Sequence, residues 1–171
     1  MSQASSDNNW KVKGAGCDVW GEQRMALAIT LRNILPTTSV ADRWFIEHGT
    51  LLGAWRSGKF IPHDDDFDIA ILYDGTLEDA RTGLEELLSV LKEALPEQYD
   101  CRLLHGSKDY ADKIEVFEPA AGKYLLAGPQ YNGADYYYVI VDLQAYCLER
   151  GESQGEKTIE LERLALDVLA R

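Results

Sequence analysis

Cysteine is scarce in this sequence of 171 residues. Its three cysteines, Cys17, Cys101 and Cys147, lie far apart, and no pair has the Cys-x-x-Cys spacing that many zinc sites and redox motifs use. An odd number of widely separated cysteines also argues against a disulfide framework. We therefore expect free thiols, and neither a zinc centre nor a disulfide-stabilised fold.

Positive charge is also in short supply. The sequence has 17 lysines and arginines against 29 aspartates and glutamates, which makes its formal net charge -12. Proteins that bind nucleic acid through their surface field need a basic face, so this balance predicts no nucleic-acid partner. An anionic substrate would be repelled by most of such a surface, and its site therefore needs metal cations or a local basic cluster.

Long apolar runs are missing as well. No stretch is long and apolar enough to span a bilayer, and Met1–Asn9 lack the basic start and apolar centre of a signal peptide. We expect no transmembrane segment and a cytoplasmic protein. Hydrophobic residues nevertheless make up 46% of the chain, which suits one domain with a sizeable core. We assign residues 1–16 to a flexible N-terminal tail and residues 17–171 to a single folded domain.

Four segments have the apolar periodicity or the boundary residues of helices. They are Val19–Leu35, Thr50–Trp55, a leucine-rich segment from Leu77 to Leu95, and Lys157–Leu169. In the first segment we place Met25, Ala28, Ile29 and Arg32 along one side, with Leu27, Leu31, Ile34 and Leu35 widening the apolar stripe. In the third segment, Thr76 and Asp79 resemble a capping box, and the periodicity is the clearest of the chain.

Short runs of β-branched and aromatic residues, with turn residues between them, predict strands. These runs are Trp44–Ile46, Phe67–Leu72, Asp100–Leu104, Lys113–Phe117, Tyr124–Leu126 and Tyr136–Leu148. Helices alternate with strands in the first half of the chain, and strands dominate much of the second half. This order predicts an α+β (mixed α/β) fold in which helices flank a small mixed β-sheet.

Four aspartates directly precede an apolar strand: Asp64, Asp65, Asp66 and Asp68. Carboxylates this close repel one another, and a divalent cation is the simplest compensation. Mg²⁺ prefers oxygen ligands and is commonly held by one or two carboxylates together with substrate phosphates. Because side chains alternate along a strand, Asp66 and Asp68 point to the same side and can share an ion. We predict these two as metal ligands, and Asp64 and Asp65 as loop or supporting residues.

A lone acid, Asp142, interrupts the apolar run Val139–Leu143. An unpaired charge is costly in such surroundings, so we expect a neighbouring strand to bring this carboxylate to the metal as a third ligand. The alternative is a solvated loop, since Asp-rich runs are also typical of loops and turns. The apolar strand that follows at once argues against this alternative for Asp66 and Asp68.

A Gly-Thr turn lies a short distance upstream of the aspartates. At His48-Gly49-Thr50 a predicted strand meets a predicted helix, and glycine permits a close backbone approach there. The first N–H groups of a helix and its partial positive charge suit a phosphate. Thr50 could cap the helix or bond a phosphate oxygen. The turn thus predicts a phosphate-binding element next to the metal ligands.

Cations and histidines surround this region. Arg56 and Lys59 are the nearest cations on the connecting segment. They could contact phosphate oxygens or simply balance the aspartates, and the two interpretations are compatible. His48 and His63 flank the predicted site, and we give both a minor role because a histidine by itself is more often structural than catalytic.

Two segments resemble the signature of the LicD family, which includes fukutin and fukutin-related protein: Gly49–Arg56 (GTLLGAWR) and Phe60–Ile69 (FIPHDDDFDI). Residues 141–143, Val-Asp-Leu, are similar to that family's later Asp-bearing strand. The resemblance implies a nucleotidyltransferase-like catalytic domain of the polymerase-β type for residues 17–171. It also implies that Asp66, Asp68 and Asp142 are the metal-binding catalytic residues and that Gly49 and Thr50 bind phosphate.

The resemblance implies a chemistry as well. Members of the family move phosphocholine or a sugar-alcohol phosphate from a CDP-linked donor to a hydroxyl acceptor, so we expect a phosphotransferase that depends on Mg²⁺ or Mn²⁺. One alternative is an NTP-dependent nucleotidyltransferase that acts on a small molecule. Another is a non-catalytic nucleotide-binding module, which the joint presence of three carboxylates and the Gly-Thr turn disfavours.

Overall fold

The computed structural model describes residues 15–106, 112–125 and 135–148. The helices of these residues are α1 (Cys17–Ile34), α2 (His48–Ser57) and α3 (Leu77–Ala94). Their strands are β1 (Trp44–Ile46), β2 (Asp68–Asp74), β3 (Asp100–Leu104), β4 (Lys113–Phe117), β5 (Lys123–Leu125), β6 (Asp135–Tyr137) and β7 (Ile140–Leu148). Short 3-10 helices follow α1 at Leu35–Thr37 and β4 at Pro119–Ala121.

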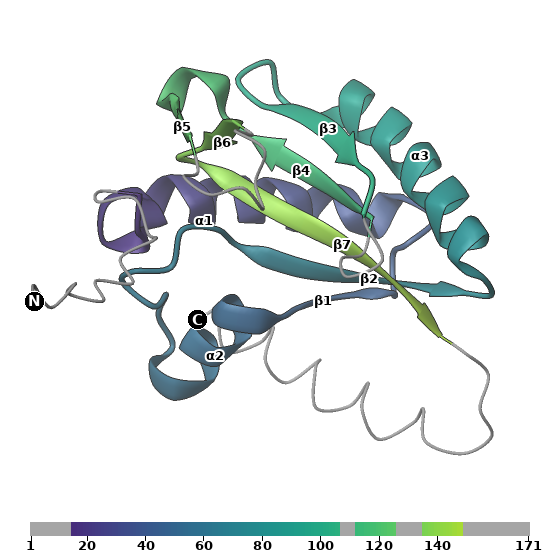
Figure 1. The fold of residues 1–171 in the computed structure, drawn as a ribbon, viewed down its shortest axis with the longest axis horizontal. Helices are drawn as coiled ribbons and strands as arrows, with labels where there is room; N and C mark the ends of the chain where they lie inside the picture. Colours follow the sequence, from purple (N-terminus) through teal and green to yellow (C-terminus); the bar gives the residue numbers. More distant parts are fainter. Residues whose placement is uncertain (1–14, 107–111, 126–134, 149–171) are drawn as a thin grey trace, which may run out of the picture.

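Five of the strands form a mixed sheet in the order β1-β2-β7-β4-β3, and β5 pairs with β6 in a separate two-stranded sheet (Figure 1). The central strands β2 and β7 run parallel, whereas the other neighbours in the large sheet run antiparallel. The predicted α+β fold with a small mixed sheet is therefore confirmed. None of the helices in the described part of the chain has the length and apolarity that a bilayer crossing requires.

The two faces of the five-stranded sheet differ in chemistry because side chains alternate along each strand. One face is apolar and almost fully buried, with Ile69, Ile71, Ile114, Val116, Val141 and Leu143. These residues share one core cluster with leucines of α1 and α3, among them Leu27, Leu31, Leu84 and Leu87. Figure 1 shows α1 running behind the sheet. The opposite face of β2, β4 and β7 carries the charged groups of the site, which the apolar core keeps in fixed positions.

The helix boundaries follow from local chemistry. The capping box at the start of α3 is confirmed: the Thr76 N–H donates to Asp79 Oδ2 over 2.7 Å, and the Asp79 N–H donates to Thr76 Oγ1 over 3.3 Å. Helix α2 ends at Gly58, whose φ of 64° lies in the left-handed region that favours glycine. It begins two residues earlier than predicted, because the Leu51 N–H already donates to the Glu47 carbonyl over 3.0 Å.

Helix α1 buries only part of the predicted apolar stripe, together with Arg24. Ile29 is 47% exposed, whereas Arg24, Leu27 and Leu31 are fully buried. Together with Ala28, the buried positions have the i, i+3, i+4, i+7 spacing of one helix face. Apolar residues occupy more than one side of this helix, so periodicity alone does not determine which side meets the sheet.

The predicted strand Tyr136–Leu148 is two strands in the structure. A break at residues 138 and 139 separates β6, which pairs with β5, from β7, which pairs with β2 and β4. Strand β2 runs from Asp68 to Asp74, slightly later than predicted. Ala15, near the end of the predicted tail, is buried in a cluster with Tyr124. The predicted helix Lys157–Leu169 and residues 1–14 lie outside the described residues.

We expect the substitution Leu84→Ala to destabilise the fold by about 2–5 kcal/mol, because it removes apolar volume from a fully buried position of α3. Leu77→Ala is the matched control. It is the same change on the same helix, but Leu77 is 80% exposed, so its effect should stay within about 0.5 kcal/mol. Urea denaturation followed by circular dichroism measures both free energies of unfolding. Equal losses would show that the buried side of α3 is misassigned.

Candidate active site

Three carboxylates from distant parts of the chain meet at the polar face of the sheet. The parallel register of β2 and β7 sets Asp68 opposite Asp142, and Asp66 precedes β2 by two residues. Carboxylate oxygens of these three residues all lie within 4.8 Å of one another. We call Asp66, Asp68 and Asp142 the carboxylate triad. The structure thus brings together the three residues that the sequence predicts as metal ligands.

The triad is largely removed from solvent, and its members repel one another. Asp68 is 6% exposed and Asp142 is 4% exposed. Burial raises the pKa of Asp66 to about 7, and the neighbouring charges of Asp142 and Asp64 act in the same direction. Burial, with the charges of Asp66 and Asp142, raises the pKa of Asp68 to about 9. A cation bound between these groups would relieve the repulsion and displace their protons.

The donor set fits a hard divalent cation. All three groups offer carboxylate oxygens, the ligands that Mg²⁺ and Mn²⁺ favour. Oδ1 of Asp142 is buried, and no hydrogen-bond donor among the described residues reaches it. A buried carboxylate oxygen without a donor is costly unless a cation or another partner occupies its lone pairs. A second group of close carboxylates, Asp64 with Asp65 and Asp66, adjoins the triad.

A row of alternating charges leads from the triad across β4 to β3. Nζ of Lys113 lies 2.5 Å from Oδ2 of Asp142 and 3.2 Å from Oε1 of Glu115. Nε of Arg102 donates to Oε2 of Glu115 over 2.7 Å. Burial alone would lower the pKa of Lys113, but the charges of Asp142 and Glu115 outweigh it and raise that pKa. The ammonium therefore stays charged beside the triad.

This row of charges was not predicted from the sequence, although a signal for it exists. Lys113 and Glu115 are two residues apart in the apolar strand Lys-Ile-Glu-Val-Phe, so they must share one face of it. Charges at alternate positions of a buried strand indicate a polar face. Only the antiparallel register, which sets Glu115 opposite Asp142, shows that this face belongs to the site.

The loop that carries the aspartates is held by the start of α1. The Cys17 N–H donates to the Asp64 carbonyl over 2.7 Å, and the Asp18 N–H donates to the Pro62 carbonyl over 2.9 Å. The fully buried guanidinium of Arg24 donates to the same Asp64 carbonyl over 3.1 Å. It also donates to the carbonyl of Tyr138, just before β7. Arg24, another residue that the sequence analysis missed, thus ties the aspartate loop to the β7 side of the site.

The Gly-Thr turn is packed against the aspartate loop. A Cβ atom at Gly49 would lie 2.2 Å from Oδ2 of Asp64, so any larger residue there would have to displace the Asp64 side chain. Asp64 therefore contacts the turn rather than lying in a solvated loop. Residue 47 is the N-cap of α2, and Thr50 does not cap the helix. Instead, the buried Thr50 hydroxyl accepts a hydrogen bond from the Asp68 N–H over 2.9 Å. Thr50 therefore fixes the start of β2.

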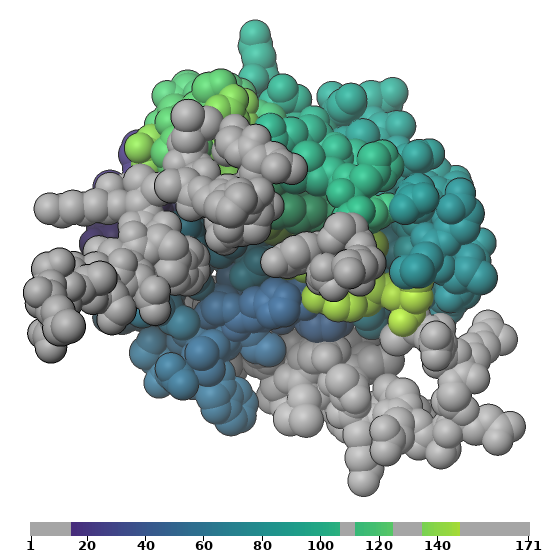
Figure 2. All heavy atoms as spheres, viewed as in Figure 1, coloured from purple at the N-terminus to yellow at the C-terminus, as the bar shows by residue number. Residues whose placement is uncertain are grey.

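The remaining predicted residues lie around the triad at varying exposure. His48 and His63 are exposed, as are Arg56 and Lys59. His48 has a φ of 47°, an uncommon conformation for a side-chain-bearing residue, and its Nε2 lies 3.4 Å from the Tyr146 hydroxyl. Figure 2 shows the surfaces of the blue region around α2 and of the yellow-green β7 on the same face of the molecule. The part of Arg56 and Lys59 in phosphate binding stays a prediction, as does the minor role of His48 and His63.

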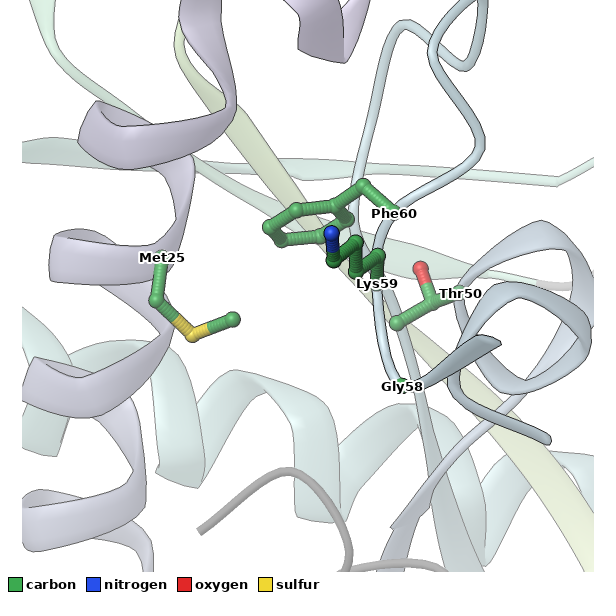
Figure 3. Close-up of a pocket in the computed structure, with 5 residues that line it drawn as sticks. All are labelled: Met25, Thr50, Gly58, Lys59 and Phe60. Atoms are coloured by element: carbon green, nitrogen blue, oxygen red, sulfur yellow. The ribbon is translucent and has the colours of Figure 1, made fainter. Parts of the chain in front are cut away.

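Lys59 lines a pocket of about 220 Å³ (Figure 3). Its other lining residues are Met25, Thr50, Gly58 and Phe60. Figure 3 shows Met25 of α1 on one side and Phe60, Lys59 and Thr50 on the other. Thr50 lines this pocket and also accepts the hydrogen bond from the N–H of Asp68, a member of the triad. It therefore lies between the pocket and the triad. Asp65, the last of the predicted supporting residues, accepts a hydrogen bond from the Tyr124 hydroxyl over 3.3 Å.

Without metal, the stability of the fold should fall as pH rises. Aspartates of the unfolded chain have a pKa of about 3.9, whereas those of Asp66 and Asp68 in the fold are about 7 and about 9. Between these values the folded chain binds more protons than the unfolded chain, so the free energy of unfolding decreases from about pH 4 to about pH 9. Stabilisation by Mg²⁺ should increase over the same range, because the ion competes with protons.

Thermal unfolding in EDTA and in Mg²⁺, at several pH values, measures this linkage. The variant with Asp66→Asn and Asp68→Asn is the control. It should show a flatter dependence on pH and little response to Mg²⁺. A wild-type melting temperature in EDTA that rises steadily up to about pH 9 would contradict the proton linkage assigned to these two carboxyls.

The substitution Thr50→Val should destabilise the fold by about 1–3 kcal/mol, because the buried Asp68 N–H loses its acceptor. Thr50→Ser keeps the hydroxyl and should lose clearly less. Urea denaturation of the two variants gives the comparison. A loss for Thr50→Ser as large as that for Thr50→Val would mean that the methyl group, rather than the hydrogen bond, accounts for the role of Thr50.

Comparison with known proteins gives a match over part of the chain. Residues 41–103 match the family model described as LicD/FKTN/FKRP, nucleotidyltransferase domain. A search of curated proteins found no match. The matched residues include β1, α2, β2 and α3, and with them Asp66 and Asp68, whereas Asp142 and Lys113 lie beyond them. Over these residues the chain is similar to the LicD family.

Proposed function

We propose that the chain is a metal-dependent transferase that moves a phosphorylated small group from a CDP-linked donor to a hydroxyl acceptor. The transferred group is of the phosphocholine or sugar-alcohol phosphate type. The observation that supports this proposal most is the carboxylate triad, whose oxygens lie within 4.8 Å of one another in a largely buried setting. The similarity of residues 41–103 to the LicD family supports a transferase rather than a binding module.

Asp66, Asp68 and Asp142 would hold the divalent cation, Mg²⁺ or Mn²⁺. When bound, such an ion offsets negative charge on the phosphoryl oxygens and orients the reacting groups. The chain supplies the rigid frame for this chemistry. The core under β2 and β7 fixes two carboxylates, and the bonds from Cys17 and Arg24 to the Asp64 carbonyl fix the loop that carries the third.

The proposed reaction is a displacement at phosphorus. The oxygen of the acceptor hydroxyl forms a bond to the phosphorus of the transferred group. The bond from that phosphorus to the bridging oxygen breaks, and CMP leaves with the bonding electron pair. The hydroxyl proton passes to a carboxylate of the triad. This balance predicts one CMP released for each group transferred, and no pyrophosphate.

Binding and product analysis test the proposal. Calorimetry with CDP-choline, CDP-ribitol, CTP and ATP, with and without Mg²⁺, should show metal-dependent binding of a CDP-linked compound to the wild type. The variant with Asp66→Asn and Asp68→Asn should lose more than about 100-fold in metal affinity, since even the outer partners of metal ligands contribute 10–100-fold. Asp74→Asn is the matched control, because Asp74 lies exposed at the far end of β2 and pairs with Arg43.

The outcomes separate the alternatives. Release of pyrophosphate from CTP or ATP would replace the proposal with an NTP-dependent nucleotidyltransferase, since the triad serves both reactions. Metal-dependent binding with no product formed from any donor and acceptor would favour a non-catalytic nucleotide-binding module. Absence of metal-dependent nucleotide binding would refute the site itself.

A further inference from the structure

Lys113 stands out because it is a partly buried cation in contact with the triad. Among the described residues, its side chain is the cation that pairs with a triad carboxylate, with Nζ 2.5 Å from Oδ2 of Asp142. One fifth of the Lys113 side chain remains exposed. An acidic chain that handles a phosphorylated donor needs local positive charge at the reacting centre. Lys113 supplies such a charge, whereas the exposed Arg56 and Lys59 show no contact with the triad in the described structure.

Glu115 holds Lys113 from a second direction. This carboxylate is fully buried and lies 3.2 Å from Nζ of Lys113. It is in turn held by Arg102, whose Nη2 lies 2.5 Å from Oε2 of Glu115 and also donates to the Asp135 carbonyl over 2.8 Å. The Arg102 guanidinium lies 5.5 Å from the ring centroid of Phe117 and 5.6 Å from that of Tyr137. These contacts anchor the row to three strands.

A counter-ion for Asp142 alone would not need this support. Burying the Glu115 carboxylate is costly, and replacing buried ion pairs by apolar residues is often neutral or stabilising. The second ion pair, with Glu115, is useful if the Lys113 ammonium has to stay in place when Asp142 coordinates a divalent cation. An ammonium has three N–H donors. Among the described residues, Asp142 accepts one of them, and Glu115 Oε1 lies at ion-pair distance without a hydrogen bond to Nζ. The ammonium therefore keeps N–H donors for a further acceptor.

We propose that Lys113 is a further catalytic residue, which donates a hydrogen bond to a non-bridging oxygen of the donor's diphosphate beside the triad. Glu115 and Arg102 are positioning residues that keep the ammonium at this place. Lys113 forms no covalent bond, and its proton stays on nitrogen throughout. Its charge offsets the negative charge on the phosphoryl oxygens as the bond to CMP breaks. This assignment rests on the proposed function, because it requires a diphosphate at the triad.

Calorimetry with pyrophosphate in saturating Mg²⁺ tests the contact without a complete donor. Lys113→Met should weaken pyrophosphate binding about 10- to 100-fold, the effect of losing a hydrogen bond between charged groups. Lys113→Arg keeps the charge and should restore part of the affinity. Glu115→Gln should weaken binding about 10-fold, as loss of a supporting partner does. Lys92→Met, at an exposed position of α3, is the matched control and should bind like the wild type.

Titration with Mg²⁺ alone distinguishes this role from a purely structural one. Removal of a competing cation from Asp142 should leave Mg²⁺ affinity unchanged or tighter in Lys113→Met, so that only pyrophosphate binding weakens. A folded Lys113→Met that binds pyrophosphate as tightly as the wild type overturns the assignment. If Lys113→Met does not fold, the pyrophosphate affinity of Glu115→Gln is the test instead. An affinity equal to that of the wild type then overturns the assignment. Failure of the wild type to bind pyrophosphate with Mg²⁺ overturns the proposed function as well.

Discussion

The parallel pairing of β2 with β7 sets the position of each group in the site. It places Asp68 opposite Asp142, and alternation along both strands turns the two carboxylates to the same face. Parallel strands require a long crossover, and here α3, β3, β4, β5 and β6 all lie between the two in sequence. The pairing forces negative charges together in a largely buried place. The row of charged side chains formed by Lys113, Glu115 and Arg102 compensates for that repulsion.

The fold separates the support of the site from its chemistry. The apolar face of the sheet packs with α1 and α3, and this core fixes β2, β4 and β7. On the polar face, the aspartate loop is fixed independently by the N-terminus of α1 and by Arg24. Phosphoryl transfer depends on positioning and electrostatics more than on covalent chemistry by the protein. A site whose carboxylates are held from both sides meets that requirement.

Local patterns account for what could be predicted. The strands Trp44–Ile46, Asp100–Leu104 and Lys113–Phe117 have the predicted bounds, because short β-branched and aromatic runs between turn residues specify them locally. The capping box at Thr76 is likewise a property of four residues. Apolar periodicity does not predict which of two apolar sides of a helix is buried. Ile29 and Leu27 are equally apolar, and packing against the sheet buries Leu27 while it leaves Ile29 half exposed.

The sequence by itself determined the α+β class, the shared side of Asp66 and Asp68, and Asp142 as a costly charge in an apolar run, because each depends on residues close together in the chain. Tertiary structure alone decided which charges meet. Arg24 reaches a carbonyl 40 residues away, and Lys113 reaches a carboxylate 29 residues away. It also showed that Thr50 bonds the Asp68 N–H. Strand order and register create these contacts, and no local preference of the chain contains that information.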